Sequence, residues 1–355
     1  MASSSSITRL SLDLPKNLPA LVAAKFREAK HTNALTLSET IVRTVRTRNV
    51  PFLLQYCPSL SKKPTSASSK PQPAHQASKS SEAEASNRPK RVNPFENPSE
   101  DLFITDVPLY SPQHYLVLNK FPIIPEHFIL ATKQYKPQTH YLEKSDLEVA
   151  FAVLEAWEQE NSRLFAFFNS GDNSGASQPH RHVQFLPVGN MAPPDTDWKP
   201  LIDDLGRQES SGVPFTWYSA ELPRGTLTGE RLHEIYLSLL QKAIGRVKSA
   251  SADQTTPAVD DADTVVSDKR EGEVEISYNL AMTTSRMVVC PRLKDGSSFP
   301  LPSGEMGEAK LNGTLLAGTV LVKERPEFEA IISNPGILED ILSNIGVRNP
   351  DTIHR

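Results

Sequence analysis

The sequence LFAFFNSGDNSGASQPHRHVQFLPV, residues 164–188, is the stretch that decides the expected fold. Its first part, residues 164–169, is a short apolar and aromatic run of the kind that forms a β-strand. Residues 170–179 are small and polar with two glycines, so they can turn tightly and present backbone N–H groups to an anion. Residues 180–186 again have the composition of a strand. The stretch therefore predicts two strands joined by an anion-binding loop.

Two histidines and a glutamine share one face of the second predicted strand. Because side chains alternate along a strand, His180, His182 and Gln184 point to one side of it. On their own, the two histidines could be a pair of metal ligands. The glycine-containing loop before them, and the lack of a third ligand nearby in the sequence, favour a phosphate site instead. Neutral imidazole is a competent nucleophile at pH 7, since its unperturbed pKa is about 6.5.

The composition narrows the class of protein. The chain of 355 residues has a formal net charge of −4 and only two cysteines, Cys57 and Cys290. Two distant cysteines argue against a disulfide framework or a cysteine-based zinc site and favour a reducing compartment. We find no apolar run of the about 20 residues that a membrane span needs, and no apolar signal segment near the N-terminus. The near-neutral charge gives no reason to expect nucleic acid as a partner, so we expect a cytoplasmic protein, with the nucleus as a second compartment, that binds neither membrane nor nucleic acid.

Two low-complexity stretches divide the chain. Residues 65–100 are rich in Ser, Ala, Pro, Lys and Glu, and residues 248–272 are acidic and rich in small side chains. Neither can bury enough apolar surface to offset the entropy lost on ordering, so both are expected to be flexible insertions. A linker between independent domains is the alternative for the first. The predicted parts that remain are residues 1–64, an N-terminal segment packing on the catalytic unit, residues 101–247, the catalytic core, and residues 273–355, a C-terminal part completing the site.

The order of the predicted elements favours an α+β fold. Strands at residues 115–120 and 128–132 come before a helix at residues 145–161, and the two strands of the opening stretch follow it. The helix has an apolar face at helical spacing, with Ser145 as the expected N-cap. Strands on both sides of a helix in this order predict an antiparallel sheet with a helix packed on one face.

Five blocks of the sequence resemble fungal diadenosine tetraphosphate (Ap4A) phosphorylases, relatives of galactose-1-phosphate uridylyltransferase in the histidine-triad superfamily. FFNSGDNSGASQPHRHVQ resembles their active-site segment, and CPSLSKKP, LVLNKFPIIPEHFILAT, YNLAMTTSRMVVCPRLK and GILEDIL lie around it in the family's order. The resemblance covers most of the chain outside the two low-complexity stretches. It implies a histidine-triad-like α+β fold with an elaborated antiparallel sheet flanked by helices.

The resemblance also assigns residues to a nucleotide site. In the family the second histidine of the active-site segment is the nucleophile, which here is His182, and His180 has a supporting role. Lysines and loop N–H groups would counter the charge of a polyphosphate. His127 is expected to be a structural, hydrogen-bonded histidine. The positions implied to bind substrate are Lys63, Asn119, Lys120, Asn169, Gly175, Ala176, Ser177, Gln178, Gln184, Thr283, Thr284, Ser285, Cys290 and Lys294.

The activity that the resemblance implies is that of a nucleotidyltransferase, an ATP adenylyltransferase or Ap4A phosphorylase. His182 would attack the α-phosphorus of Ap4A and release ATP, and inorganic phosphate would then attack the adenylyl-histidine to give ADP. Histidine-triad hydrolases that resemble this segment have a third histidine where this chain has Gln184. An amide can hydrogen-bond to a phosphoryl oxygen but cannot shuttle a proton, so Gln184 favours transfer to phosphate over hydrolysis.

Other functions and partners stay open at this point. A dinucleoside polyphosphate hydrolase or a uridylyltransferase-like enzyme would use the same fold, and a non-catalytic nucleotide-binding sensor would keep the same pocket. The expected partners are Ap4A, ATP, ADP and phosphate, with sulfate as a second acceptor in an ADP sulfurylase side reaction. A divalent cation such as Mg²⁺ could accompany the polyphosphate, although no carboxylate cluster marks a site for it. No organic cofactor is expected, and the chain is expected to be a monomer or a weak dimer.

Overall fold

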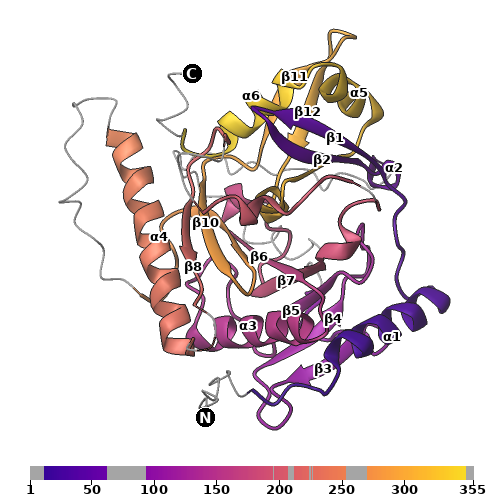
Figure 1. Cartoon of the computed structure of the whole chain (residues 1–355), viewed down its shortest axis with the longest axis vertical. Helices are drawn as coiled ribbons and strands as arrows, with labels where there is room; N and C mark the ends of the chain where they lie inside the picture. The colour runs from indigo at the N-terminus through magenta and orange to yellow at the C-terminus, as the bar shows by residue number, and fades with distance from the viewer. Residues whose placement is uncertain are drawn as a thin grey trace, which may run out of the picture.

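The computed structural model covers most of the chain (Figure 1). Lys63 and most of the two expected insertions, residues 65–92 and 253–269, lie outside the described residues. The described residues are 12–61, 93–194, 196–206, 212–223, 225, 227–252 and 270–348.

Helices and strands are mixed along the chain. The strands are β1 (Ile41–Thr47), β2 (Val50–Tyr56), β3 (Phe103–Val107), β4 (His114–Leu118), β5 (Phe128–Thr132), β6 (Leu164–Ser170), β7 (His182–Pro187), β8 (Tyr218–Glu221), β9 (Ser277–Met282), β10 (Arg286–Arg292), β11 (Gly296–Pro300), β12 (Met306–Lys310) and β13 (Thr319–Val322). The helices are α1 (Leu18–His31), α2 (Pro58–Ser61), α3 (Lys144–Gln159), α4 (Gly229–Ala252), α5 (Arg325–Ser333) and α6 (Gly336–Ile345). Short 3₁₀ turns are η2 (Asp172–Ser174), η3 (Val188–Asn190), η4 (Leu201–Asp203) and η6 (Gly313–Ala317). Within the described ranges, every helix is too short or too polar to span a lipid bilayer.

An antiparallel sheet of eight strands forms the centre of the described structure, in the order β3-β4-β5-β7-β6-β9-β10-β8. Gln184 of β7 lies opposite Phe167 of β6, which in turn lies opposite Ala281 of β9. Opposed residues in a sheet point to the same face. Side chains of β7 therefore alternate between a face that carries Phe185 and a face that carries His182 and Gln184. The expected α+β fold with an elaborated antiparallel sheet is confirmed.

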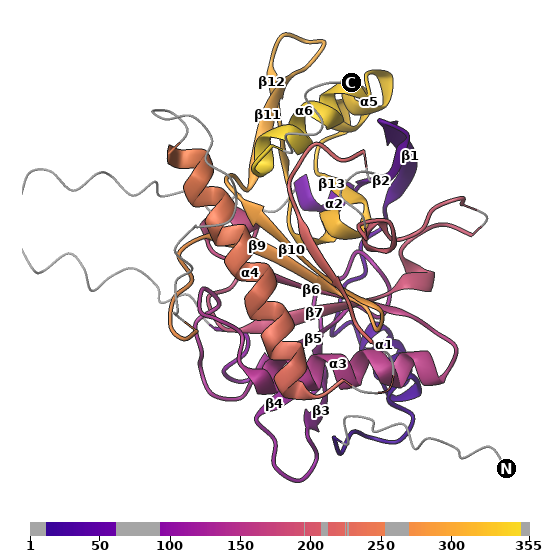
Figure 2. The same ribbon diagram turned by 60° about the vertical axis from the view of Figure 1, so that its left-hand side comes forward.

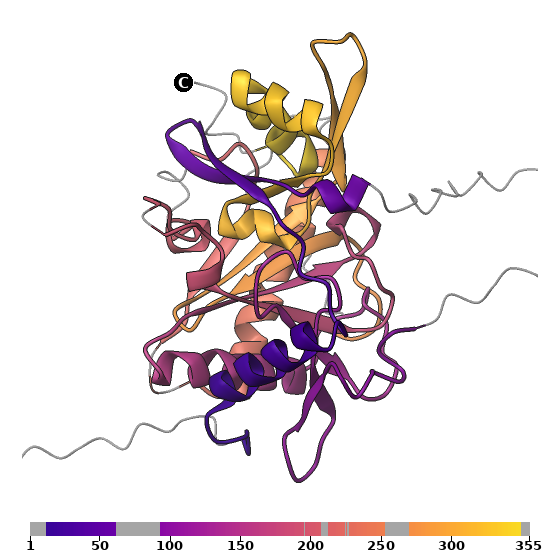
Figure 3. The ribbon, with the colours of Figure 1, turned by 90° about the vertical axis from the view of Figure 1, so that its right-hand side faces the viewer.

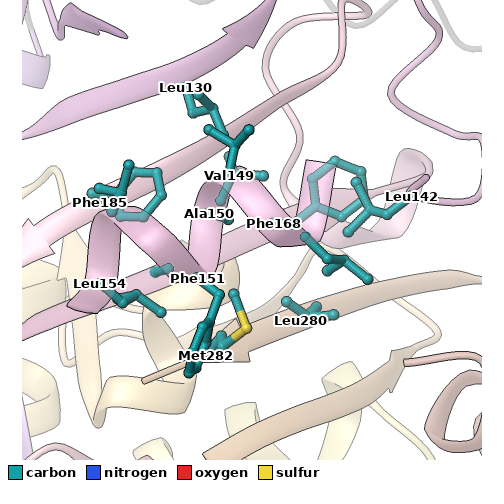
Figure 4. Packing of buried hydrophobic residues seen from close by; sticks show 14 of the residues in the cluster. Leu130, Leu142, Val149, Ala150, Phe151, Leu154, Phe168, Phe185, Leu280 and Met282 are labelled. Atoms are coloured by element: carbon teal, nitrogen blue, oxygen red, sulfur yellow. The ribbon is translucent and has the colours of Figure 1, made fainter. Parts of the chain in front are cut away.

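Helices α1, α3 and α4 cover the Phe185 face of the sheet (Figures 1 and 2). Apolar residues recur every three or four positions along α3, so one side of this helix can pack on the strands. Figure 4 shows α3 lying over the sheet, with Phe151 close to Met282 of β9. The ring of Phe128 stacks between those of Phe185 and Trp157, at centroid distances of 5.0 and 5.1 Å. This layer is the first hydrophobic core of the protein.

Segments from the two ends of the chain cover the opposite face, which carries His182. β2 pairs antiparallel with β1 and parallel with β13, so the three strands form a second sheet. Figures 1 and 3 show this sheet and helices α5 and α6 together at the end of the molecule opposite α1 and α3. The turn η6 contacts β6 and β9. Apolar side chains of this layer, among them Phe52, Leu316 and Ile341, form a second core.

Two predicted element boundaries differ from the structure. The N-cap of α3 is Glu143, not Ser145, because the Glu143 N–H donates to the Asp146 carboxylate at 2.8 Å and so begins the helix earlier. The predicted strand at residues 180–186 begins only at His182. His180 lies just before it, where the chain still follows the loop.

The expected insertions are shorter than composition indicated. Residues 93–100, placed in the first flexible stretch, are among the described residues, and Phe95 is only 6% exposed within the first core. Helix α4 runs on to Ala252, into the second stretch. One large apolar side chain is enough to hold a polar segment in place, and average composition does not register it.

Replacing Phe128 with alanine should lower the free energy of unfolding by about 3–5 kcal/mol, because it removes the central ring of a buried stack. Urea unfolding followed by tryptophan fluorescence measures the loss. Leu109→Ala is the control: its side chain is 41% exposed, so the change should stay below about 0.5 kcal/mol. Equal stability of the two variants would mean that the stack does not belong to the rigid core.

Candidate active site

The loop between β6 and β7 is shaped by its two glycines. Gly171 and Gly175 have φ angles of 85° and 77°, a region that side chains rarely adopt. A Cβ atom on Gly175 would lie 2.7 Å from the carbonyl oxygen of Leu311 and 2.8 Å from Cβ of Asn312. Both distances are too short for atoms that are not bonded. Glycine is therefore required where the loop passes the chain that follows β12.

Asn169, near the end of β6, ties this loop to the C-terminal part. Its Oδ1 accepts hydrogen bonds from the Gly313 N–H at 2.8 Å and from Asn279 Nδ2 at 2.9 Å. Asn279 Nδ2 also donates to the carbonyl of Ser174 in the loop, at 2.9 Å. Both asparagines are buried, where an unpaired amide would be costly. The pair therefore fixes the start of the loop against η6.

A buried arginine supports the same corner. Arg292 of β10 is 2% exposed, and its guanidinium donates to Oδ1 of Asn279. It also donates to the carbonyls of Lys294 at 2.9 Å and Leu311 at 3.0 Å, on either side of the β11–β12 hairpin. Burial lowers its pKa to about 10, so it stays charged at neutral pH. In the sequence its one signal is that a basic residue follows the apolar run VVCP.

His182 has the two properties that a nucleophilic histidine needs. The side chain is 3% exposed, and Nδ1 is 2.8 Å from the carbonyl oxygen of His180. Because a carbonyl only accepts, Nδ1 carries the proton and Nε2 keeps its lone pair. Burial lowers the pKa of His182 to about 4, so the ring is neutral at pH 7. The imidazole is therefore uncharged and in one defined tautomer.

His180 is anchored at both ring nitrogens. Its Nε2 donates to the carbonyl of Thr132 at 2.8 Å, and its Nδ1 accepts from Asn93 Nδ2 at 3.0 Å. Phe95, two residues after Asn93, has its ring centre 4.9 Å from that of His182. His180 therefore holds the carbonyl that orients His182, and residues 93–95, at the end of the first low-complexity stretch, close this side of the site.

A chain of hydrogen bonds sets the orientation of Gln184. The Phe121 N–H donates to Asn119 Oδ1 at 2.9 Å, so the amide nitrogen of Asn119 faces His127 Nδ1, 3.0 Å away. Nδ1 of His127 therefore accepts, and its Nε2 carries the proton and donates to Gln184 Oε1 at 3.1 Å. Among the described residues nothing accepts from Gln184 Nε2. This amide nitrogen is left to donate to a ligand.

His127 is hydrogen-bonded, as expected, but its partners place it in the site. Part of its surface still faces a pocket, yet the loss of water around most of the ring lowers its pKa to about 4. Repulsion from His182 acts in the same direction. The sequence could have placed His127 near Gln184 only with the register of β5 against β7, in which Ile129 lies opposite Gln184.

A pocket opens beside Gln184. It encloses about 770 Å³, a volume that includes its open mouth. Asn119 and Gln184 give its lining polar groups, Phe167 gives an aromatic ring, and Lys310 adds a positive charge. His182 lies on the same face of the sheet, two residues along β7 from Gln184. The pocket therefore lies beside Gln184, on the same face of the sheet as the imidazole of His182.

Several predicted residues are open to solvent around the site. Ala176 and Ser177 in the loop are exposed, and Gln178 is half-buried. Lys120, after β4, and Lys294, after β10, are both exposed. Long exposed lysines can turn toward an anionic ligand at little cost.

The predicted substrate positions in the C-terminal part do not lie together beside Asn169. They are Thr283, Thr284, Ser285, Cys290 and Lys294. Asn279 pairs with Asn169, and residues 283–285 form the turn at the other end of β9. Cys290 lies opposite Asn279 but is wholly buried, and burial raises the pKa of its thiol to about 12. Lys63 lies outside the described residues. The assignment of these positions to the substrate site stays a prediction.

His182 and His127 should be opposite tautomers. His182 should carry its proton on Nδ1 and His127 on Nε2, because the His180 carbonyl and the Asn119 amide fix them so. Nitrogen-15 NMR of histidine-labelled protein at pH 7 measures this, with His127→Gln and His182→Ala used to assign the signals. A proton on Nδ1 of His127 would mean that the Asn119 amide is turned over, and that Gln184 presents its oxygen to a ligand.

Comparison with known proteins identifies relatives of the whole chain. A family model described as the Ap4A phosphorylase N-terminal domain matches residues 9–202, and one described as the ATP adenylyltransferase C-terminal domain matches residues 211–348. Two proteins of Saccharomyces cerevisiae are similar over 360 residues. Protein APA1 is 28% identical, over 95% of this chain and 97% of its own length. Diadenosine 5',5'''-P1,P4-tetraphosphate phosphorylase 2 is 27% identical, over 95% and 96%.

Solved structures share the fold. Yeast Ap4A phosphorylase Apa2 in complex with Ap4A superposes with a TM-score of 0.71 at 24% identity, over 95% of this chain and 99% of that one. Apa2 in complex with AMP gives a TM-score of 0.68 at 25% identity, with the same coverage of 95% and 99%. The first family model alone spans more than half of the sequence. The chain therefore belongs to the Ap4A phosphorylase family.

Proposed function

We propose that this chain cleaves Ap4A by phosphorolysis into ATP and ADP, through an adenylyl group carried on His182. The observation that carries the proposal is the fixed tautomer of His182: Nδ1 donates to the His180 carbonyl at 2.8 Å, and Nε2 keeps its lone pair on the face that bears Gln184. Family membership supports it, because a similar yeast protein is named a diadenosine tetraphosphate phosphorylase.

In the first step, Nε2 of His182 attacks the α-phosphorus of Ap4A. A P–N bond forms, the bond from that phosphorus to the bridging oxygen breaks, and ATP leaves as a stable anion that needs no proton. The ring then carries a positive charge, which the Nδ1–H bond to the His180 carbonyl stabilises. The amide nitrogen of Gln184 can donate to a phosphoryl oxygen as charge develops on it.

In the second step, inorganic phosphate attacks the same phosphorus. A P–O bond forms, the P–N bond breaks, and ADP leaves behind a neutral His182. Phosphate is already an anion and needs no base, whereas water would have to lose a proton. Gln184 cannot accept one, and the lone pair of His127 Nδ1 already accepts from the Asn119 amide. This arrangement favours phosphate over water, and sulfate as an acceptor of similar shape would give the ADP sulfurylase side reaction.

The charge of the polyphosphate has to be countered. Lys120 and Lys294 are exposed, and Lys310 lines the pocket. In the part of the chain that the structure describes, His, Cys, Asp and Glu do not gather in any group of three or more that could hold a metal ion. We therefore expect any Mg²⁺ to arrive bound to the polyphosphate, and we expect no organic cofactor.

The protein is expected to act on small nucleotides as a monomer or weak dimer, in the cytoplasm with the nucleus as a second compartment. Cys57 and Cys290 are both free thiols and both buried, which suits a reducing environment. Gel filtration with light scattering at micromolar concentration measures the oligomeric state.

Purified protein should convert Ap4A to ATP and ADP only when inorganic phosphate is present. Without phosphate it should release stoichiometric ATP and keep a radiolabelled adenylyl group. His182→Ala should lower turnover by a factor of about 10⁴ or more and abolish the labelling, because it removes the nitrogen that attacks the phosphorus. Anion-exchange chromatography separates the nucleotides.

Other outcomes of this assay point to other functions. ATP with AMP in the absence of phosphate would identify a dinucleoside polyphosphate hydrolase. Transfer of a nucleotidyl group to a sugar phosphate would identify a uridylyltransferase-like enzyme. Binding of Ap4A without any cleavage would identify a nucleotide-binding sensor.

The rate of adenylyl-enzyme formation should be independent of pH between about 5.5 and 8, because an ordinary histidine has a pKa of about 6.5 while burial lowers that of His182 to about 4. The reactive form is the neutral ring, which is present above the pKa and is lost as pH falls through it. Ap4A has no terminal phosphate, so its own charge is constant over this range. Single-turnover quench-flow measures the profile, and a midpoint near 6.5 would contradict the expected burial of the ring.

A further inference from the structure

The hydrogen-bond ladder between β6 and β7 stops just short of the nucleophile. Its last pair is Phe167 with Gln184. Two residues further along each strand, the same register would place Asn169 opposite His182. At that position the side chain of Gln138 lies between the two strands and takes the place of their direct backbone hydrogen bonds. Gln138 belongs to the connection between β5 and α3.

Gln138 bonds to both strands at once. Its Oε1 accepts from the His182 N–H at 2.7 Å. Its Nε2 donates to the carbonyl of Asn169 at 2.9 Å and to the carbonyl of His182 at 3.2 Å. The residue is 2% exposed. One amide therefore hydrogen-bonds to the N–H and the carbonyl of His182 and to the carbonyl of Asn169.

The backbone on either side of Gln138 is held in place. Its N–H donates to the carbonyl of Pro179 at 2.8 Å, just before the nucleophile strand. The next residue, Thr139, accepts from the Val274 N–H at 3.0 Å, just before β9. The segment thus lies where β6 and β7 separate beyond their last pair. It directs the Gln138 side chain into the space between these two strands.

We propose that Gln138 is a positioning residue for the nucleophile: it keeps the backbones of His182 and Asn169 apart at a fixed spacing, so that Nε2 of His182 meets the phosphorus bound at the loop. The proposal rests on the role of His182 proposed above. Without the Gln138 side chain, the N–H and carbonyl of His182 would be buried and unpaired. The strands β6 and β7 could then pair directly at Asn169 and His182. A shift of about 1 Å at a reacting atom can cost a factor of about 10² in rate.

A purely structural role for Gln138 makes a different prediction. It would lower stability, and the rate would fall only as far as the folded fraction falls. The positioning role lowers the rate of the chemical step in the folded protein and leaves the binding of Ap4A almost unchanged. Stability, binding and the single-turnover rate of adenylyl transfer therefore have to be measured on the same variants.

Gln138→Met keeps the length of the side chain and removes its three hydrogen bonds. We expect folded protein with a lower melting temperature, a Kd for Ap4A within about threefold of wild type, and adenylyl transfer slower by a factor of about 10². Tyr236→Phe is the matched control. It removes buried hydrogen bonds to the Leu142 N–H and the Tyr278 hydroxyl on the helical side of the sheet, so it should lower the melting temperature and leave the rate unchanged.

Gln138→Glu gives a test that stays informative if the methionine variant does not fold. A neutral glutamic acid can accept from the His182 N–H and donate its one proton to a carbonyl, which keeps two of the three bonds. An ionised one would set a negative oxygen against the carbonyls of His182 and Asn169, and burial raises its pKa above the ordinary value of about 4.3. The rate should be recovered at low pH and lost as pH rises through that raised pKa.

The rate of Gln138→Glu is expressed relative to wild type at each pH. The neighbouring groups His180 and His182, and His140 on the same segment with Glu273, which pairs with it, are present in both proteins. Their contributions therefore cancel in the ratio. A ratio that falls with rising pH supports the positioning role.

Several results would overturn this inference. The first is adenylyl transfer at the wild-type rate in both variants, and the second is a pH-independent ratio for Gln138→Glu. A loss of rate in Tyr236→Phe as large as that in Gln138→Met, at equal loss of stability, would also overturn it. Failure of the proposed function is recognised separately, because wild-type protein would then form no adenylyl-enzyme at all.

Discussion

Both faces of the central sheet are covered, and this is the constraint on which the site depends. Water does not reach the buried polar groups of such a layer, so most of them are paired within the protein. His182 donates to the carbonyl of His180, and Asn169 accepts from an N–H of η6. Gln184 accepts from His127. The tautomers and amide directions of the site follow from this exclusion of water. Its reactive groups are accordingly neutral and rigid before any substrate arrives.

The alternation of side chains along one strand was enough to predict the centre of the site. His182 and Gln184 share a face because strand side chains repeat every two residues, and the structure has them there. The register of distant strands could not be predicted, and with it three residues were missed. His127 is brought to Gln184 by the pairing of β5 with β7, while Gln138 and Arg292 act through backbone groups far away in sequence. In the sequence alone each looks like an ordinary connection or strand end.

Composition predicted the two low-complexity stretches but could not set their edges. A window of polar residues hides the few that make contacts, and Asn93 and Phe95 are two of these. They contact His180 and His182, so the described residues that begin at Asn93 are part of the site from their first member. The C-terminal edge of the first low-complexity stretch therefore lies next to the nucleophile.

The parallel pairing of β2 with β13 joins segments from opposite ends of the chain. During synthesis β2 leaves the ribosome well before β13, so this contact cannot form until the chain has been made as far as residue 322. The eight-stranded sheet and its helices need none of the residues after β10. In a nascent chain the eight-stranded sheet can thus be complete while its face that carries His182 is still exposed to water. The second core, which covers the face that carries His182, therefore closes last.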